Sequence, residues 1–269
     1  MITKITSTKN DLVKEIINLK TKSKERKKNK AIIIEGYREI GLAIRASVKI
    51  KKMLYCPEVI SYDDIEKLFG KKMDFDVYEV SESVFSKVSY RETTGGVIVI
   101  AEMPNKDLHD LKVSDQSIFI ILESVEKPGN LGAICRVADA ARVDGVIICD
   151  PHTDVYNPNS VRSSLGCVFT VNVVNSGYEE TVKWLKQNNI NSYAAELNAS
   201  EFYQNVDFKG NIALIFGTEA TGLTDKWLIS ADKRIKIPMG GVIDSLNVTT
   251  SVAILVFEAM RQRNFSYSI

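Results

Sequence analysis

From Ser117 onwards, the chain alternates short apolar runs with segments of helical character. The apolar runs lie at Ile118–Leu122, Gly145–Cys149, Val168–Val173, Asn191–Ala195, Ile212–Phe216 and Arg234–Ile237. Such runs are typical of strands buried on both faces, and helices between them favour parallel crossover connections. The sequence therefore predicts an α/β domain with a parallel sheet. A final helix is expected over Asn247–Arg263, with basic residues in its last turn.

The front of the chain predicts a second, smaller α/β domain. A β-branched strand begins at Ala31 and runs through Gly36 into a helical pattern that continues to Ser47. Further strands are expected over Lys52–Cys56, Val77–Val80 and Gly96–Glu102, with a helix over Asp63–Phe69. A polar stretch over 103–112 interrupts this pattern. We therefore expect a front domain over 1–104, a linker over 105–115 and a second domain over 116–269.

Length and composition fit an ordinary globular protein with two domains. The 269 residues are 45% hydrophobic and 26% charged. No apolar run reaches the roughly 18 residues that a membrane span needs, and the N-terminus lacks the apolar stretch of a secretory signal. We expect a cytoplasmic protein with no membrane partner.

Cysteine and histidine supply little chemistry. The four cysteines, Cys56, Cys135, Cys149 and Cys167, are widely spaced and form no C-x-x-C pair, so we expect reduced core residues. The only histidines are His109 and His152. We therefore expect no metal site and no histidine-based catalysis.

The net charge of +1 conceals an asymmetry between the two halves. Residues 1–110 carry 21 Lys and Arg against 17 Asp and Glu, whereas residues 111–269 carry 14 against 17. Much of the basic excess lies between Lys20 and Lys30. This charge is equally compatible with a polyanion partner and with a solvated helix face.

Two common glycine patterns for nucleotide binding are missing. No G-x-G-x-x-G follows a predicted strand. Gly217-Thr-Glu-Ala-Thr-Gly222 has the spacing of a phosphate loop, but Leu223-Thr224 follows it in place of Lys-Ser/Thr. A nicotinamide enzyme or an ATP enzyme is therefore disfavoured.

Three other segments follow a predicted strand or open a helix, where backbone N–H groups can hold a ligand. They are Pro128-Gly-Asn-Leu-Gly-Ala-Ile-Cys-Arg136, Ile215-Phe-Gly-Thr-Glu-Ala-Thr-Gly-Leu223 and Ile237-Pro-Met-Gly-Gly-Val-Ile-Asp-Ser-Leu-Asn-Val248. Each is weak alone. Together, in this order, they resemble the three signature motifs of the SpoU (TrmH) family of RNA 2′-O-methyltransferases. One departure precedes the first motif, where Glu126-Lys127 stand in place of an aspartate.

The resemblance covers nearly the whole chain. Ile34-Glu-Gly-Tyr-Arg38 and the helix after it look like the opening of the L30e-like substrate-binding domain of many family members. For the second domain, the resemblance implies the SPOUT methyltransferase fold, with a C-terminal trefoil knot that strand periodicity does not predict. It also implies a homodimer, S-adenosylmethionine as the cofactor and RNA, above all ribosomal RNA, as the partner.

The resemblance also assigns site residues. The matching cofactor positions are Gly217, Ile237 and Leu246, with Leu197 and Thr218 as further contacts; Gly222, Met239 and Val248 complete the expected cofactor set. Main-chain groups would read the adenine edge while apolar walls exclude water. Any one of these glycines alone would more simply shape a turn.

The expected catalytic set is Arg136, Asn130, Glu219, Ser245 and Asn247. Arg136 matches the family's catalytic arginine. Because a guanidinium rarely gives up a proton, we expect Arg136 to orient phosphate and stabilise the developing oxyanion. Asn130 is expected to cap its helix and position the substrate, and Glu219 to hold Arg136 or a ribose hydroxyl. For Ser245 and Asn247, helix capping and contact with a ligand are equally plausible interpretations.

Basic residues of the front domain are candidates for RNA backbone contacts, and Arg162 is a candidate for an RNA phosphate near the active site. The expected set is Lys22, Lys24, Arg26, Lys27, Lys28, Arg38, Arg91 and Arg162. Three alternatives to ribosomal ribose methylation stay open. They are a transfer RNA substrate, a base as methyl acceptor, and an RNA-binding protein without catalysis.

Overall fold

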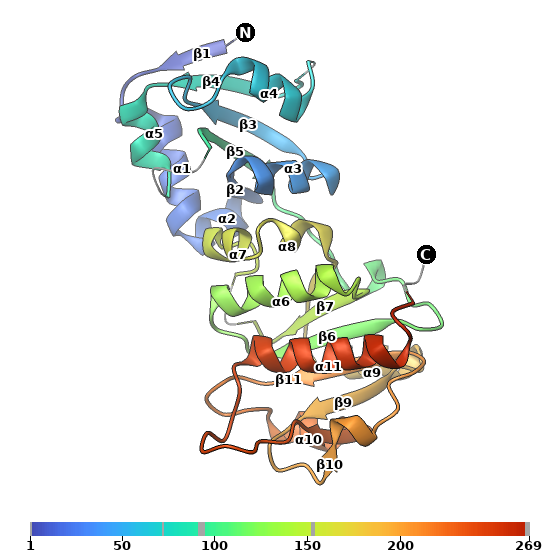
Figure 1. Ribbon diagram of the computed structural model, residues 1–269. Helices are drawn as coiled ribbons and strands as arrows, with labels where there is room; N and C mark the ends of the chain where they lie inside the picture. Colours follow the sequence, from blue (N-terminus) through green and yellow to red (C-terminus); the bar gives the residue numbers. More distant parts are fainter. Residues whose placement is uncertain (1, 72, 91–94, 152–153, 267–269) are drawn as a thin grey trace. The chain divides into compact units, whose positions relative to one another are not determined.

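The computed structural model describes residues 2–71, 73–90, 95–151 and 154–266. The chain forms two units, and each is described by itself (Figure 1). The first comprises Met1–Pro104 together with Tyr156–Thr170, and the second comprises Asn105–Val155 and Val171–Ile269. The segment Tyr156–Thr170 thus packs with the first unit, although it lies within the range expected for the second domain.

The first unit is built on a mixed five-stranded sheet in the order β1-β4-β3-β5-β2. Its strands are β1 Ile2–Ile5, β2 Ala31–Glu35, β3 Ile50–Tyr55, β4 Asp76–Val80 and β5 Val97–Glu102. Its helices are α1 Asp11–Thr21, α2 Ser23–Asn29, α3 Tyr37–Arg45, α4 Tyr62–Phe69, α5 Glu82–Val88, α7 Pro158–Ser163 and α8 Cys167–Thr170. Strand β5 runs antiparallel to both β2 and β3. The expected strand–helix unit at Ala31 is confirmed as β2 and α3.

The basic segment before Ala31 is helical. Helix α1 begins after Asn10, whose side chain accepts a hydrogen bond from the backbone N–H of Leu12 at 2.9 Å. Its apolar face, which includes Val13 and Ile16, is buried in the core of the first unit. Most of the lysines therefore lie on the opposite, solvated side.

One predicted strand is wrong. The run Val168–Val173 was expected to form a strand, but Cys167–Thr170 is the short helix α8, and strand β8 begins only at Val173. The chain enters α8 through Gly166, which has a φ of +87°. A Cβ atom at Gly166 would lie 3.0 Å from the Cα atom of Glu39 in α3. Close packing against α3 therefore determines the structure of this segment.

The second unit contains a seven-stranded sheet in the order β10-β12-β9-β11-β6-β7-β8, and every pair is parallel. Its strands are β6 Ile118–Glu123, β7 Gly145–Cys149, β8 Val173–Ser176, β9 Asn191–Ala195, β10 Glu201–Phe202, β11 Ile212–Phe216 and β12 Lys233–Lys236. Its helices are η1 Leu108–Asp110, α6 Pro128–Ala140, α9 Tyr178–Gln187, η2 Tyr203–Asn205, α10 Asp225–Ser230 and α11 Val248–Gln262. The predicted parallel sheet is confirmed.

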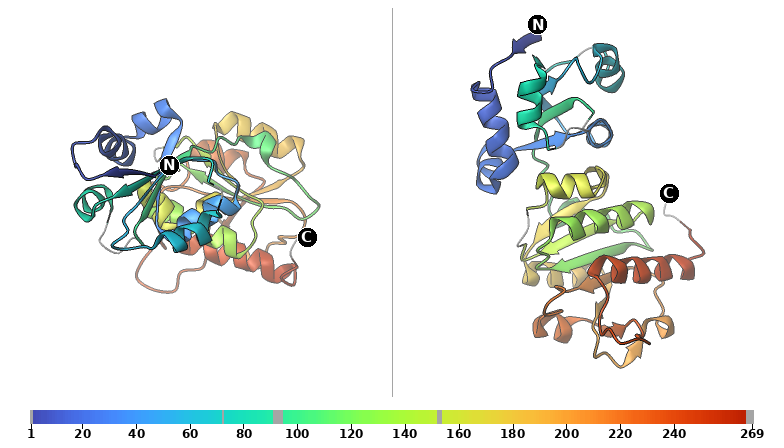
Figure 2. Two further views of the ribbon diagram at one scale, coloured as in Figure 1. Left: turned by 90° about the horizontal axis from the view of Figure 1, so that it is seen from above. Right: turned by 60° about the vertical axis from the view of Figure 1, so that its left-hand side comes forward.

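Helices cover both faces of this sheet. Helices α6 and α11 pack side by side over one face (Figures 1 and 2). On the other face, Trp184 of α9 and Trp227 of α10 are buried in a core with Phe119 and Ile121 of β6. Because alternate residues of β6 point to opposite faces, its apolar residues 118–122 serve both cores.

All four cysteines are buried and none of them forms a disulfide, as expected. Burial is the main cause that raises the pKa of Cys56 to about 11 and that of Cys149 to about 12, so these two thiols stay protonated at neutral pH. Within the expected linker, Leu108 is buried in the core of the second unit. In the ranges that the structure describes, no helix is long and apolar enough to span a membrane.

Candidate active site

The loop after β11 has an unusually tight backbone. Thr218 and Gly222 exchange two backbone hydrogen bonds of 3.1 Å, and Gly222 has a φ of +69°. A Cβ atom at Gly217 would lie 2.1 Å from both the carbonyl carbon and the carbonyl oxygen of Gly222. Only glycine fits at position 217, because any side chain would collide with the backbone that closes this loop.

This loop forms one wall of a cleft with a volume of about 480 Å³. The other walls are the segment that follows β9 and the segment that leads into α11. Six of the expected cofactor residues line the cleft, namely Leu197, Gly217, Thr218, Gly222, Leu246 and Val248. The remaining two, Ile237 and Met239, are half-buried and lie outside the set of described residues that line it.

Beside the cleft, a polar cluster brings the three motif segments together. Asn130 donates a side-chain hydrogen bond of 3.0 Å to Oε1 of Glu219, and Asn247 donates to the same oxygen. The Asn247 amide also lies 3.3 Å from Oδ1 of Asn130. Lys127 binds the other carboxylate oxygen of Glu219 as a salt bridge. We call Lys127, Asn130, Glu219 and Asn247 the Glu219 cluster.

These contacts favour the charged form of Glu219. The pKa of Glu219 is lowered, chiefly by the hydrogen bond from Lys127 and further by those from Asn130 and Asn247. The pKa of Lys127 is raised by the same ion pair. Both groups are therefore charged at neutral pH, and the carboxylate acts as a fixed acceptor for the two amides.

The structure changes the role expected of Asn130. The N-cap of α6 is Lys127, and Pro128 occupies the first helical position, so Asn130 lies inside the first turn and does not cap the helix. Asn247 does cap α11, because its Oδ1 accepts the backbone N–H of Thr249 at 2.9 Å. Ser245 lines the cleft, and its hydroxyl bonds to Asp244 at 3.3 Å.

Arg136 lies further along α6, and its side chain is exposed. Among the residues that the structure describes, none forms a hydrogen bond or ion pair with Arg136. The expected contact between Arg136 and Glu219 is therefore not found, since Glu219 is held by Lys127, Asn130 and Asn247. Arg136 remains available for a ligand.

Two residues that sequence reasoning missed belong to this region. Glu196, directly after β9, lines the cleft, and its Oε2 is buried without a hydrogen bond among the described residues. Nη1 of Arg234 lies 3.7 Å from that oxygen. In the sequence, Lys127 departs from the family pattern, and no sequence signal points to its ion pair with Glu219. For Glu196, an acidic residue directly after a buried strand was the one available signal.

The expected RNA contacts are placed as follows. Lys22, Lys24, Lys27, Lys28 and Arg38 are exposed, Arg162 is half-buried in α7, and Arg91 lies outside the described residues. Arg26 is buried, and its Nη1 donates to the carbonyl oxygens of Leu19 at 2.6 Å and of Lys20 at 3.2 Å. Since these carbonyls belong to the end of α1, Arg26 has a structural role, and we no longer count it among the RNA contacts.

Within the described ranges, no group of three or more His, Cys, Asp or Glu side chains is arranged to hold a metal ion.

Residues 117–257 match the SpoU rRNA Methylase family, and residues 10–99 match an MRM3-like substrate binding domain. Among curated proteins, the chain is 32% identical over 253 residues to the 23S rRNA (guanosine(2553)-2′-O)-methyltransferase RlmP of Bacillus subtilis. That alignment covers 94% of this chain and 97% of the relative.

Solved structures agree with this assignment. An AdoMet-bound rRNA methyltransferase from Sinorhizobium meliloti is 30% identical, with a TM-score of 0.88 over 97% of this chain and 98% of that one. The SpoU methyltransferase AviRb from Streptomyces viridochromogenes, in complex with the cofactor AdoMet, is 26% identical, with a TM-score of 0.88 over 96% of this chain and all of that one. The resemblance drawn from the three motifs is thereby confirmed, and the chain belongs to the SpoU rRNA methylase family.

Proposed function

We propose that this chain is an S-adenosylmethionine-dependent methyltransferase that methylates a ribose 2′-hydroxyl in ribosomal RNA, and that it works in the cytoplasm. The observation that carries the proposal is the Glu219 cluster, which lies beside the cleft and joins all three motif segments. The names of the relatives favour ribosomal over transfer RNA, because both RlmP and the uridine(2479) methyltransferase of Streptomyces viridochromogenes are named for 23S rRNA.

The residues of the cleft fit the cofactor. The absence of a side chain at Gly217 lets the 217–222 loop close on itself, so that its backbone forms one wall of the cleft. Glu196 supplies a buried carboxylate oxygen that lacks a hydrogen bond among the described residues. Burying an unsatisfied acceptor is unfavourable, so a hydroxyl or amine donor in the cleft would stabilise the site. Leu197, Leu246 and Val248 supply the apolar walls.

When bound, S-adenosylmethionine supplies an electrophilic methyl group. The protein's task is to align the ribose hydroxyl with that methyl group and to stabilise the charge that develops on the hydroxyl oxygen as its proton passes to water. We assign the alignment to the Glu219 cluster, whose carboxylate fixes the amides of Asn130 and Asn247. Fixed amides can hold a hydroxyl without the cost of reorganisation during the reaction.

Arg136 would interact with negative charges of the substrate. A guanidinium stays protonated in proteins, so its part is to bind a substrate phosphate and stabilise the developing alkoxide. Its exposed position and its lack of a partner among the described residues support this role. An Arg136→Ala variant should keep S-adenosylmethionine binding and lose most methyl transfer. Transfer equal to that of the wild type would exclude the role.

We also propose that the second unit contains the trefoil knot and mediates a homodimer, as the family resemblance implies. The exposed Phe257 of α11, with 42% of its surface accessible, supports an apolar contact at this helix. The RNA would be held by the first unit, whose exposed lysines Lys22, Lys24, Lys27 and Lys28 contact the backbone without reading the sequence. Light scattering of the purified chain tests the dimer, since a monomeric mass would exclude it.

The function is tested by transfer of labelled methyl from S-adenosylmethionine to separate pools of unmodified ribosomal and transfer RNA. The proposal expects label in ribosomal RNA. Label in transfer RNA alone would overturn the substrate, and cofactor binding without transfer to either pool would overturn the choice of acceptor. If the cofactor does not bind, the chain is a non-catalytic RNA-binding protein.

A further inference from the structure

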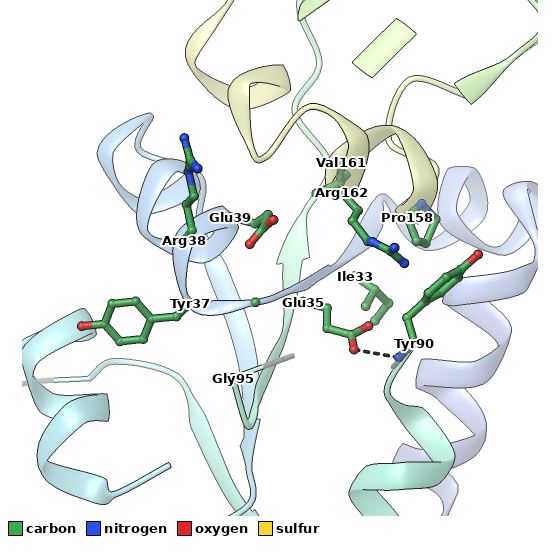
Figure 3. A pocket seen from close by; sticks show the side chains of 11 residues that line it. Ile33, Glu35, Tyr37, Arg38, Glu39, Tyr90, Gly95, Pro158, Val161 and Arg162 are labelled. Carbon is green, nitrogen blue, oxygen red and sulfur yellow. Dashed lines mark hydrogen bonds between the residues drawn. The ribbon is translucent and has the colours of Figure 1, made fainter. Parts of the chain in front are cut away.

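The first unit contains a cavity of about 360 Å³ (Figure 3). The loop that joins β2 to α3, the residues Tyr90 and Gly95, and helix α7 surround it. Ile33 and Val161 form an apolar floor, and each has only 2% of its surface exposed. The volume falls within the range of about 300–1,000 Å³ that is usual for ligand sites.

An exposed aromatic ring is held at the edge of this cavity. Tyr90 has 45% of its surface accessible, yet its backbone N–H donates a 2.7 Å hydrogen bond to Oε1 of Glu35. Two cations lie close to its ring, with Cζ of Arg162 4.8 Å from the centroid and Nζ of Lys20 at 5.2 Å. Lys20 is itself fixed by hydrogen bonds to the carbonyl oxygens of Val88 and Ser89. The ring is therefore positioned, although solvent reaches it.

A carboxylate with no partner among the described residues also lines the cavity. Glu39 lies in the first turn of α3, and its Oε2 lies 2.4 Å from the place where a Cβ atom of residue 36 would be. Gly36, with a φ of +105°, leaves room for it. In the parts of the chain that the structure describes, Glu39 forms no hydrogen bond or ion pair, so its acceptor oxygens are available to a ligand.

Arg162 does not neutralise these acidic groups. Its guanidinium lies against Tyr90, and no carboxylate within the described ranges forms an ion pair with it. Figure 3 shows the side chains of Glu35, Tyr90 and Arg162 gathered on one side of the cavity, whereas those of Tyr37 and Arg38 point away from it. The cavity thus combines a tyrosine ring and the guanidinium over it with a separate hydrogen-bond acceptor.

We propose that this cavity binds one unstacked guanine base of the RNA substrate, an inference that rests on the proposed function. Unstacked bases are recognised by stacking on aromatic rings or guanidinium planes and by hydrogen bonds to their edges. Guanine presents two adjacent N–H donors, N1–H and the N2 amino group, which match the two oxygens of a carboxylate such as Glu39. Uracil presents only one donor on this edge, and adenine and cytosine offer only an amino group.

The inference gives the first unit a task beyond electrostatic attraction. The exposed lysines Lys22, Lys24, Lys27 and Lys28 can contact phosphates of any sequence. A base pocket adds selection for an RNA in which a guanine is extruded from the stack, such as a loop or bulge. Tyr90, Arg162 and Glu39 would then be specificity-determining residues.

The test uses the full-length protein and three labelled pentaribonucleotides, UUGUU, UUAUU and UUUUU, with binding followed by fluorescence anisotropy at one fixed salt concentration. The wild type should bind UUGUU most tightly. Because loss of base stacking weakens binding markedly, Tyr90→Leu should reduce the affinity for UUGUU by roughly 5- to 100-fold. Tyr62→Leu is the matched control, since Tyr62 is also an exposed tyrosine of this unit, 37% accessible, but does not line the cavity.

Glu39→Gln provides a second variant that does not alter the packing of the ring. It should abolish the preference for UUGUU over UUAUU while leaving the affinity for UUUUU unchanged. Equal binding of the three pentamers by the wild type, or an unchanged preference in Glu39→Gln, would overturn the inference. Competition by guanosine monophosphate at the same concentration as UUGUU would show that a free nucleotide, not RNA, is the ligand.

The two proposals fail separately. Pentamer binding needs no methyl transfer, so loss of the guanine preference leaves the catalytic proposal intact. Calorimetric titration with S-adenosylmethionine, performed on the wild type and on both variants, reports the second unit alone and should be unaffected by Tyr90→Leu or Glu39→Gln.

Discussion

The side-chain amide of Asn247 donates a hydrogen bond to the carboxylate of Glu219, which lies 28 positions earlier in the chain. Glu219 belongs to the tight loop after β11, and Asn247 caps α11. One contact thus ties the loop that lines the cleft to the helix that closes the second unit. Through Glu219, Asn130 of α6 joins the same cluster.

Glu219→Gln should reduce methyl transfer with little effect on cofactor affinity. The glutamine cannot form the ion pair with Lys127, and its uncharged oxygen is a weaker acceptor for Asn130 and Asn247. Hydrogen bonds to charged groups contribute about 1.5–3 kcal/mol, which corresponds to a loss of about 10- to 100-fold in rate. Asp225→Asn, an exposed carboxylate of α10, is the control. Equal rates for the two variants would contradict the role of the cluster.

The ion pair between Lys127 and Glu219 predicts a pH dependence. The pKa of Glu219 is lowered, so its contribution to stability is present above its ordinary pKa of about 4.3 and is lost as the pH falls through the lowered value. The pKa of Lys127 is raised, so its contribution is present below about pH 10.4 and is lost as the pH rises through the raised value. Between these limits the pair is fully formed.

Lys127→Met should therefore move the acid loss of stability to a higher pH, because the pKa of Glu219 rises when its main partner is removed. Urea unfolding midpoints between pH 3 and pH 7 provide the measurement. The same substitution made in Glu219→Gln should cause no further shift. Parallel pH profiles for the wild type and Lys127→Met would show that the ion pair does not hold the carboxylate.

Gly217→Ala should abolish cofactor binding. The new methyl group would lie 2.1 Å from the backbone of Gly222, so the loop would have to open. Gly177→Ala is the control, because nothing lies within 4 Å of a Cβ atom at that position. Calorimetry with S-adenosylmethionine should detect binding by Gly177→Ala only. Normal binding by Gly217→Ala would mean that the closed loop is not needed.

Arg26→Met and Lys27→Met change neighbouring residues of α2 and should have different effects, the first on stability and the second on RNA affinity. Arg26 is buried on carbonyl groups at the end of α1, so its loss should destabilise the protein by about 1–3 kcal/mol. Lys27 is exposed, and its loss should weaken RNA binding and leave the urea midpoint unchanged. A stable Arg26→Met variant with weakened RNA binding would restore Arg26 as an RNA contact.

Sequence patterns predicted the strands that are buried on both faces, because such strands must be apolar throughout. The bounds of β7 and β11, which are buried throughout, match the expectation, as do those of the more polar β9. The same reasoning failed at Cys167–Thr170, where an equally apolar run is helical. The difference arises from the packing of Gly166 against Glu39, a residue far away in the sequence. Local composition carries no information about such a contact.

The residues of the candidate site were also predicted only in part, because contacts that the fold creates cannot be read from local sequence. Motif positions identified Glu219 and Asn247, and the structure brings them together. The sequence does not predict that Lys127 is the ion-pair partner of Glu219. The fold alone determines that Lys127, and not Arg136, lies close enough to this carboxylate. The buried oxygen of Glu196 was missed because an unsatisfied acceptor is a property of its surroundings.

The central claim is tested most directly by the chemical nature of the product. Ribosomal RNA labelled by the protein and S-adenosylmethionine is hydrolysed with alkali, and the label is then located. A methyl group on the 2′-hydroxyl blocks cleavage at its own nucleotide, so the account predicts label in alkali-resistant dinucleotides. Label in mononucleotides would show a methylated base and would contradict the proposed reaction.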